Sequence, residues 1–461
     1  MQYTSTRGQS PDLEFGEVLL AGLARDGGLY VPCEWPQLSH DDLWGLADLS
    51  YAGAAARILA PFMDGIEQDE LEEMARAAYD VFADDSVVPL RQLSESHWLM
   101  ELFHGPTLAF KDVAMQLLCR LFDRELHSQG RRITIVGATS GDTGSAAIEA
   151  CKDRDSIDIF ILYPHGRVSE VQRRQMTTVL SDNVHNIAIE GTFDDCQALV
   201  KGAFNDLAFR DEIGMSAVNS INWARVVAQV VYYITTAVAA GAPDRKVSFA
   251  VPTGNFGCVF AGYVAAQMGL PVDKLIVATN RNDILHRFFQ TGTYRKDKVF
   301  ATQSPSMDIQ VASNFERLLF DLAGRDSAVV RKNMAKLTEQ GGFEVSSAAM
   351  SQAHVLFLSH CVDEEATTRT IGEVYRTTGT IIDPHTAVGL QAAYELTPDG
   401  PVIALATAHP AKFPDAVEKA CGVRPTLPDQ MADLYEREER FVTLPNNQAA
   451  LQDHIRGLRR A

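Results

Sequence analysis

The fold is decided by Ile133-Thr134-Ile135-Val136-Gly137-Ala138-Thr139-Ser140-Gly141-Asp142-Thr143-Gly144, a stretch that changes character at its middle. Its first residues are β-branched and predict a strand, whereas the small residues after them predict a loop that opens a helix. Three more short apolar runs alternate with helical stretches, at residues 157–162, 184–189 and 216–221. Strands separated by helices are typical of βαβ units, so this part of the chain is predicted to form a parallel sheet of about four strands.

A second series of predicted strands follows later in the chain. It comprises residues 247–251, 274–279 and 401–406. The fold class is therefore α/β, with two open, mainly parallel twisted sheets. Residues 1–95 are mostly helical, with long helical patterns at residues 42–59 and 67–82. The predicted domains are a helical N-terminal region at 1–95, a larger α/β domain made of 96–130 and 226–461, and a smaller α/β domain at 131–225.

The composition excludes several classes of function. Of the 461 residues 46% are hydrophobic and 22% are charged, values typical of globular proteins and not of disordered or coiled-coil chains. The 41 Lys and Arg against 60 Asp and Glu give a net charge of −19. So negative a surface repels phosphate backbones and anionic lipids, which argues against nucleic acid and membrane partners. Any anionic ligand must then be held by a local cluster of donors.

The cysteines and the N-terminus indicate a cytoplasmic protein. The seven cysteines are scattered and have no CxxC or Cys/His ligand spacing, which favours a reducing compartment without structural zinc. The first residues contain no apolar stretch of the kind that a secretory signal needs. The longest apolar run, residues 226–242, is short for a membrane span and is predicted to be a buried core helix.

Lys111 is the first candidate for chemistry. A turn at Gly105-Pro106 leads into a predicted helix, in which Met115, Leu118 and Phe122 share a face with Lys111. Burial on that face would disfavour the ammonium form and lower the pKa of Lys111, as a lysine that attacks a carbonyl group requires. A lysine that reaches from the first turn to solvent fits the same placement equally well.

Two loops with glycines are predicted to join a strand to a helix. One is the loop at residues 137–144, and the other is Pro252-Thr253-Gly254-Asn255-Phe256-Gly257. Backbone amides at the start of a helix form a site for a phosphate or a carboxylate. The second loop has neither the GxGxxG nor the GxxxxGK[ST] spacing, and tight turns also need glycine for steric reasons. An anion site and a structural turn therefore remain alternative interpretations of both loops.

Two further segments carry polar groups at the ends of elements. Arg225 falls in the first turn of a helix that Asn222 is predicted to cap, where a cation opposes the helix dipole. A bound anion would compensate it, although an ion pair with a carboxylate is the more common explanation. Thr407 and His409 follow a buried strand, where open α/β sheets bind ligands. A lone histidine such as His409 more often has a structural role.

These features together favour one class of enzyme. No HExxH metal motif and no GxSxG nucleophile motif is present in the sequence. One amine on an apolar face and several anion sites in a two-domain α/β fold suit a pyridoxal phosphate enzyme better than any other class. The predicted cofactor is pyridoxal 5′-phosphate, and no metal is predicted.

The sequence resembles the threonine synthase family of fold-type-II pyridoxal phosphate enzymes, which have the tryptophan synthase β-like fold. The resemblance extends from the N-terminal segments at 3–8 and 26–32, through 107–112 and 140–144, to Thr407-Ala408-His409-Pro410-Ala411-Lys412-Phe413. It implies that Lys111 is the catalytic residue that binds the cofactor covalently. The other cofactor-binding residues that it implies are Gly254, Asn255, Phe256, Gly257 and Cys258 at the phosphate and Thr407 at the pyridine nitrogen.

The resemblance also implies a substrate site. The substrate-binding residues that it implies are Thr139, Ser140, Asp142 and Thr143 in the first loop, and Asn219, Ser220 and Arg225 at the substrate phosphate. Lys412 is the next candidate for that phosphate. Many relatives have asparagine where Asp142 stands, and a carboxylate donates no hydrogen bond unless it is protonated, so the role of Asp142 stays open.

The activity that the resemblance implies is conversion of O-phosphohomoserine and water to threonine and phosphate. Two alternatives are a related lyase, such as serine/threonine dehydratase, and a non-enzymatic protein that binds small anions. The segment at residues 219–225 suits a phosphorylated substrate and argues against the first alternative. The expected partner is therefore a small molecule, and the protein is expected to be a monomer or a homodimer.

Overall fold

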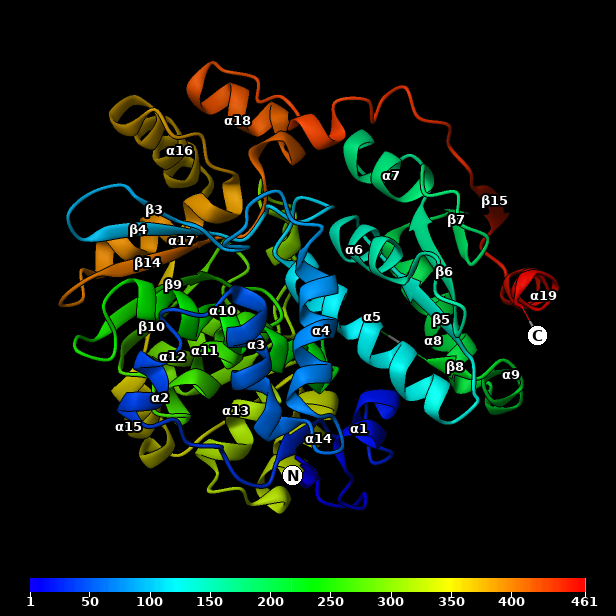
Figure 1. The fold of residues 1–461 in the computed structure, drawn as a ribbon, viewed down its shortest axis with the longest axis horizontal. Helices are drawn as coiled ribbons and strands as arrows, with labels where there is room; N and C mark the ends of the chain where they lie inside the picture. The colour runs from blue at the N-terminus through cyan, green and yellow to red at the C-terminus, as the bar shows by residue number, and fades with distance from the viewer. Residues whose placement is uncertain (217, 461) are drawn as a thin grey trace.

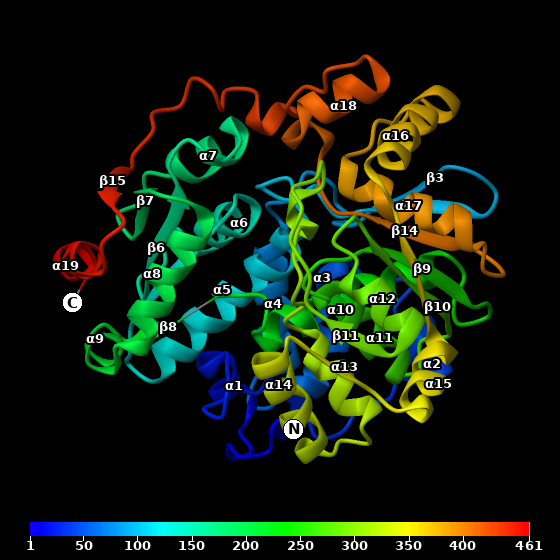
Figure 2. The ribbon, with the colours of Figure 1, turned by 180° about the vertical axis from the view of Figure 1, so that it is seen from behind.

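The computed structural model describes residues 1–216 and 218–460. Two sheets lie side by side in it, and the long helix α5 (Lys111–Ser128) runs between them (Figures 1 and 2). The larger sheet has the order β13 (Phe357–Cys361), β10 (Val272–Thr279), β9 (Val247–Pro252), β14 (Val402–Ala406), β4 (His97–Glu101) and β3 (Leu90–Gln92). The smaller sheet has the order β15 (Val442–Pro445), β7 (Val184–Glu190), β6 (Ile157–Pro164), β5 (Ile133–Ala138) and β8 (Met215–Ser216).

All neighbouring strands are parallel except β3, which runs antiparallel to β4 at the edge of the larger sheet. Two short antiparallel pairs, β1 (Tyr3–Ser5) with β2 (Tyr30–Pro32) and β11 (Thr293–Arg295) with β12 (Gly342–Glu344), lie outside both sheets. The predicted α/β fold with two mainly parallel sheets is confirmed.

Helices cover both faces of each sheet. The other helices are α1 (Phe15–Ala21), α2 (His40–Trp44), α3 (Tyr51–Leu59), α4 (Gln68–Tyr79), α6 (Asp142–Cys151), α7 (Glu170–Thr177), α8 (Phe193–Asn205), α9 (Leu207–Glu212), α10 (Trp223–Ala239), α11 (Gly257–Gln267), α12 (Ile284–Thr291), α13 (Phe315–Leu322), α14 (Ser327–Gln340), α15 (Ser347–Leu356), α16 (Glu364–Thr378), α17 (Pro384–Leu396), α18 (Pro414–Cys421) and α19 (Gln448–Leu458). Helix α17 packs on one face of the larger sheet, and α11 and α12 pack on the other.

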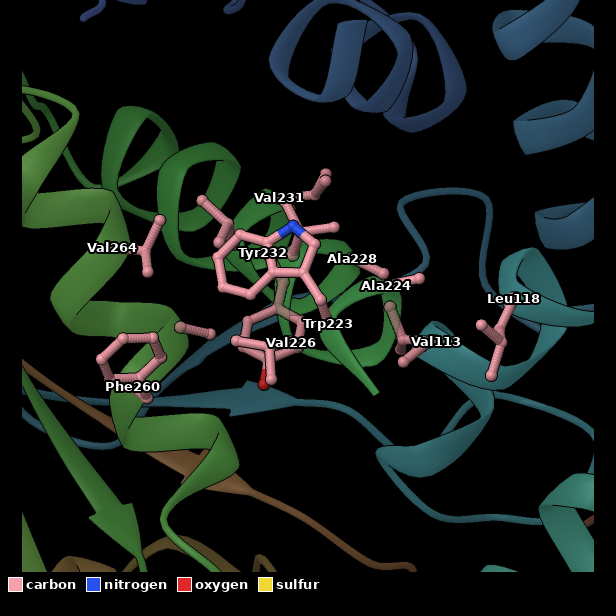
Figure 3. Close-up of a cluster of buried hydrophobic side chains, with 14 of the residues drawn as sticks. Val113, Leu118, Trp223, Ala224, Val226, Ala228, Val231, Tyr232, Phe260 and Val264 are labelled. Carbon is pink, nitrogen blue, oxygen red and sulfur yellow. The ribbon is translucent and has the colours of Figure 1, made fainter. Parts of the chain in front are cut away.

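Helix α10 is the centre of the main core, as the apolar run in the sequence predicts. Its side chains Trp223 and Val231 are fully buried and lie between Leu118 of α5 and Phe260 of α11 (Figure 3). Asn222 caps α10 by accepting a hydrogen bond from the Ala224 amide at 3.0 Å. Within the described ranges, no helix combines the length and the apolar character needed to cross a membrane.

Two predicted elements have the wrong boundaries. The predicted strand at 216–221 is confirmed only at its start, where β8 ends at Ser216. Residue 217 lies outside the described residues, and residues 218–222 are irregular with a turn at 220–221. The Asn219 and Asn222 side chains bond to nearby backbone amides there, which competes with strand pairing. The predicted helix at 42–59 is two helices, because Ser50 caps the start of α3.

Two of the predicted domain ranges, 226–461 and 1–95, end at the wrong place. Strand β15 pairs with β7 and α19 packs on α8, so the end of the range 226–461 belongs to the smaller unit. The chain after α18 crosses from the larger unit to the smaller one to reach β15 (Figures 1 and 2). Strand β3 lies within the predicted N-terminal region 1–95 but joins the larger sheet. Hydrogen bonding to an existing sheet edge outweighs position in the sequence in both cases.

Candidate functional site

The candidate site lies where two neighbouring strands of the larger sheet end. Strands β9 and β14 are parallel and pair Ala250 with Ala404, so their carboxyl ends lie at the same edge. The loop that contains Gly254 follows β9, and Thr407 follows β14. This edge is where ligands bind in open α/β sheets.

Lys111 is joined to this edge through the backbone. It is the first residue of α5, and the amide of Phe110 donates to the Thr407 carbonyl at 2.9 Å. The turn before it is fixed by the buried Asp112, which accepts hydrogen bonds from the Thr107 amide at 2.8 Å and the Thr107 hydroxyl at 2.6 Å. The start of α5 therefore has a fixed position beside Thr407.

The Lys111 amine points into the protein. Its side chain is only 12% exposed, and Nζ lies 3.7 Å from Oδ2 of Asp142. Burial lowers the pKa of Lys111, and the positive charges of Lys412 and Arg225 lower it further, whereas Asp142 opposes them. The alternative of a lysine that reaches out to solvent is therefore wrong. Near neutral pH, a larger fraction of Lys111 is therefore in the free-amine form than of an exposed lysine.

Asp142 is an ionised counter-ion. Its Oδ1 accepts from Nζ of the fully buried Lys412 at 2.8 Å and from Nε2 of Gln172 at 2.9 Å. Burial alone would raise the pKa of Asp142, but the charges of Lys412 and Lys111 and the hydrogen bonds hold it well below its usual range. An ionised carboxylate accepts hydrogen bonds and does not donate them, so Asp142 cannot act as a donor here.

We expect Asp142→Asn to lower the free energy of unfolding by roughly 3 kcal/mol at neutral pH, because Lys412 stays buried without its carboxylate. The pKa of Asp142 is depressed in the folded state, so its contribution is complete at neutral pH and is lost as the pH falls below about 4. The difference from wild type should therefore shrink in acid. Urea unfolding across this pH range measures it, with Asp194→Asn, an exposed position, as the control. A difference independent of pH would contradict the ion pair.

The second glycine loop leads into α11 with little room around it. A Cβ on Gly254 would lie 2.9 Å from the Ser306 carbonyl oxygen, and one on Gly257 would lie 3.3 Å from Nδ2 of Asn314. Phe256 has a φ of 65°, unusual for a residue other than glycine, and its ring packs edge-on against Phe315. Strained backbone of this kind is concentrated at ligand-binding loops.

Arg225 is a buried cation without a carboxylate. It lies in the first turn of α10, and one guanidinium nitrogen donates to the Val218 carbonyl at 2.9 Å, while Nε has no partner among the described residues. No carboxylate of the described chain lies within ion-pair distance of it, so the more common explanation for its position is wrong. Burial lowers the pKa of Arg225 to about 10, so it stays charged at neutral pH.

The other predicted substrate-site residues lie in the segment before α10 and in the first glycine loop. Asn314 joins Ser220 to the second loop, because its Nδ2 donates to the Ser220 carbonyl at 2.9 Å and to the Asn255 carbonyl at 3.2 Å. Asn219 is exposed beside Ser220. Thr139 is buried, and its hydroxyl oxygen accepts the amides of Gly141 and Gly144 at 3.0 and 2.9 Å, so it shapes the first loop.

Ser140 is exposed and Thr143 is half-buried, so both hydroxyls are accessible to a ligand. Cys258 is partly buried and packs against the main core, and burial raises the pKa of its thiol to about 11. His409 has the structural role expected of it, because its Nδ1 accepts the Ala411 amide at 3.2 Å.

Several contacting residues were missed by sequence reasoning. Gln172 holds Asp142, Ser306 lies against Gly254, and His385 contacts Ser306. Only His385 had a local signal, the helix start Asp383-Pro384, and Ser306 lies in a turn with no motif. The sequence predicts Lys412 as the second candidate for the substrate phosphate, whereas in the structure its Nζ binds Asp142 and the Thr107 carbonyl.

Three family models match the chain. The model described as threonine synthase N terminus matches residues 2–79, and the one described as threonine synthase, C-terminal, matches residues 386–455. Between them, residues 83–337 match the model for pyridoxal-phosphate dependent enzymes.

Similar proteins match over nearly the whole length. A threonine synthase of Pseudomonas aeruginosa is 55% identical over 459 residues, which cover 99% of this chain and 98% of the relative. The threonine synthase of Saccharomyces cerevisiae is 43% identical over 91% of this chain and 88% of the relative. Among solved structures, a pyridoxal-phosphate-bound threonine synthase from Brucella melitensis has a TM-score of 0.99 and 54% identity, with both chains covered completely.

Proposed function

Because the chain belongs to the threonine synthase family of pyridoxal-phosphate-dependent enzymes, we propose that it converts O-phosphohomoserine and water to threonine and phosphate. The observation that carries the assignment of its site is a group of buried cations with too few carboxylates: Lys111 and Lys412 share Asp142, and the nearby Arg225 has no carboxylate among the described residues. Uncompensated buried charge is costly, so this group favours anionic ligands.

The residues fit pyridoxal phosphate. Lys111 is a buried amine of lowered pKa, which suits a lysine that bonds to the cofactor aldehyde. The Gly254 to Cys258 loop, with the start of α11, is our proposed site for the cofactor phosphate. The cofactor, once bound, supplies an electron sink for negative charge that develops on the substrate.

We assign proton transfer to Lys111. Its Nζ, when free, takes a proton from the substrate Cα and returns protons at the neighbouring carbons. Asp142 holds the Lys412 ammonium, which keeps a second buried cation fixed close to the reacting amine. Thr407 is buried and uncharged, and we place its hydroxyl at the ring nitrogen, where it leaves that nitrogen largely without a proton.

We assign binding of the substrate phosphate to Arg225, with Asn219 and Ser220. The unpartnered Nε of Arg225 supports this role, because a guanidinium binds phosphate through two parallel hydrogen bonds. The substrate loop would be formed by Thr139, Ser140, Asp142 and Thr143, of which Ser140 and Thr143 have accessible hydroxyls. A dehydratase needs no phosphate site, so Arg225 favours the synthase over that alternative.

The reaction is tested by product analysis. Purified holoenzyme given O-phosphohomoserine should release phosphate and threonine in equal amounts. The same protein given serine or threonine should form a 2-oxo acid far more slowly. Turnover of serine or threonine at the higher rate, with no phosphate released from O-phosphohomoserine, would favour the dehydratase.

The phosphate loop is tested most cleanly at Gly257. We expect Gly257→Ala to weaken cofactor binding about tenfold, a change of roughly 1.4 kcal/mol, because the added methyl group would lie 3.3 Å from Nδ2 of Asn314 and would shift the proposed phosphate loop. Alanine suits the first position of α11, so the thermal stability of the cofactor-free protein should fall only slightly as Asn314 adjusts. Fluorescence titration with pyridoxal phosphate measures the affinity, with Gly457→Ala in α19, where the added methyl group meets open space, as the control. Wild-type affinity in Gly257→Ala would show that the loop is only a turn.

A further inference from the structure

The turn at residues 304–308 touches both parts of the proposed site. The Ser306 carbonyl lies against Gly254 so closely that a Cβ there would be 2.9 Å from it. The Ser306 hydroxyl lies 3.4 Å from Oδ2 of Asp142 and donates to it. Ser306 is therefore a link between the proposed cofactor-phosphate loop and the carboxylate beside Lys111.

The side chain of His385 binds the backbone of this turn. The Ser306 amide lies 3.3 Å from Nε2 of His385 and donates to it. On the other side of the ring, Nδ1 of His385 lies 2.8 Å from Oδ1 of Asp383. A carboxylate only accepts, so Nδ1 carries the proton and Nε2 is left as an acceptor, the tautomer that the Ser306 amide needs.

Neighbouring residues restrict the orientation of the His385 imidazole. Asp383 and His385 are both buried, and Asp383 also caps the start of α17 by accepting the amides of His385 and Thr386. The ring of Phe413, which follows Lys412, packs at 4.8 Å from the His385 ring. The orientation of the ring is therefore fixed from three directions.

The turn itself is built from buried polar contacts. Asn280 follows β10 and donates through Nδ2 to the Ser304 hydroxyl at 2.9 Å and to Oδ1 of Asp308 at 2.8 Å. These bonds hold the two ends of the turn at the edge of the larger sheet. Its middle residue, Ser306, has its amide held by His385 alone among the described residues.

We propose that His385 is a positioning residue for cofactor binding, which holds Ser306 so that its turn braces the Gly254 loop and Asp142. The inference rests on the proposed cofactor site. Without the His385 acceptor, the Ser306 amide would lose its bond and the turn could move away from Gly254. The role of His385 depends on its hydrogen bond to the Ser306 amide, so it can be tested by substitutions that remove one side of the ring at a time.

Asparagine and glutamine separate the two sides of His385. The amide of asparagine reaches about as far as Nδ1, so His385→Asn keeps a donor for Asp383 and loses the acceptor for Ser306. The longer His385→Gln places an amide oxygen near the position of Nε2 and keeps that acceptor. We expect His385→Asn to raise the dissociation constant of pyridoxal phosphate about tenfold and His385→Gln to stay within about threefold of wild type.

The measurement is fluorescence titration of the cofactor-free full chain with pyridoxal phosphate, together with thermal unfolding of the same samples. A purely structural role as the partner of Asp383 predicts the reverse order, with His385→Gln the more damaging. Equal cofactor affinities in both variants, or that reverse order, would overturn the proposal. Failure of wild-type protein to make threonine would instead count against the proposed function, and the affinity comparison would still hold.

Ser306→Ala provides a second test, since its partly exposed side chain can be shortened without loss of the fold. The variant keeps the backbone bond to His385 and loses only the hydroxyl that reaches Asp142. We expect wild-type cofactor affinity and a KM for O-phosphohomoserine raised about threefold, because Asp142 loses one donor. Unchanged KM would show that the turn does not brace Asp142 and would overturn that half of the proposal.

Discussion

Lys111→Ala is expected to lower kcat by at least about a thousandfold, because it removes both the covalent attachment of the cofactor and the group that moves protons. Steady-state release of phosphate from O-phosphohomoserine measures the loss. Cofactor binding should weaken as well, since the bond to Nζ is lost. The control is Lys201→Ala, which removes an exposed lysine of α8 and should leave kcat unchanged.

The pH dependence of cofactor capture adds a test of the same lysine. Burial lowers the pKa of Lys111, so the free amine, which is the reactive form, prevails at lower pH than for an exposed lysine. The rate at which cofactor-free protein captures pyridoxal phosphate should therefore rise with pH and level off below about 10.4, the ordinary pKa of lysine. Turnover of Lys111→Ala within tenfold of wild type would contradict the assignment.

Arg225→Ala is expected to lower kcat/KM for O-phosphohomoserine roughly 30-fold or more, a loss of about 2 kcal/mol, because a charge-assisted hydrogen bond to the substrate phosphate is removed. Arg225→Lys keeps the charge but loses the paired geometry of the guanidinium, so it should be impaired to a smaller extent. Cofactor affinity should stay near that of wild type in both variants. Steady-state kinetics and fluorescence titration provide the two measurements.

A second buried arginine serves as the control. Arg317 also lacks a carboxylate within 4.0 Å in the described chain, but its nitrogens donate to the carbonyls of Tyr30 and Ile221 and to Asn314. Arg317→Lys should therefore lower the thermal stability strongly and kcat/KM only slightly. Full activity of Arg225→Ala, or its failure to fold, would show that Arg225 has a structural role and would direct the search for the phosphate site to Lys412.

The elements of the fold could be predicted because their sequence signals are local. The β-branched run at 133–136 and the apolar run of α10 each determine their own structure through periodicity. The place of β15 could not be predicted, because pairing with β7 depends on a partner more than 200 residues away in the chain. The break between α2 and α3 shows a different limit, since a cap at Ser50 interrupts a pattern that otherwise continues.

The candidate site also has residues that could be predicted from the sequence and partners that could not. Lys111, Arg225 and the Gly254 loop stand at helix starts, where the sequence itself indicates unusual chemistry. The partners that set their electrostatics come from distant segments: Lys412 binds Asp142 across 270 residues, and His385 binds Ser306 across 79. Sequence reasoning could indicate that Arg225 needs an anion, but only the structure shows that no carboxylate of the described chain supplies it.

The central claim is that the buried amine of Lys111 is the point of attachment of the cofactor. Borohydride reduction of the holoenzyme fixes the cofactor to its lysine permanently, and proteolysis with mass spectrometry then identifies the modified peptide. The account predicts one cofactor adduct per chain, on the peptide that contains Lys111. An adduct on Lys412 or on any other lysine, with Lys111 unmodified, would contradict it.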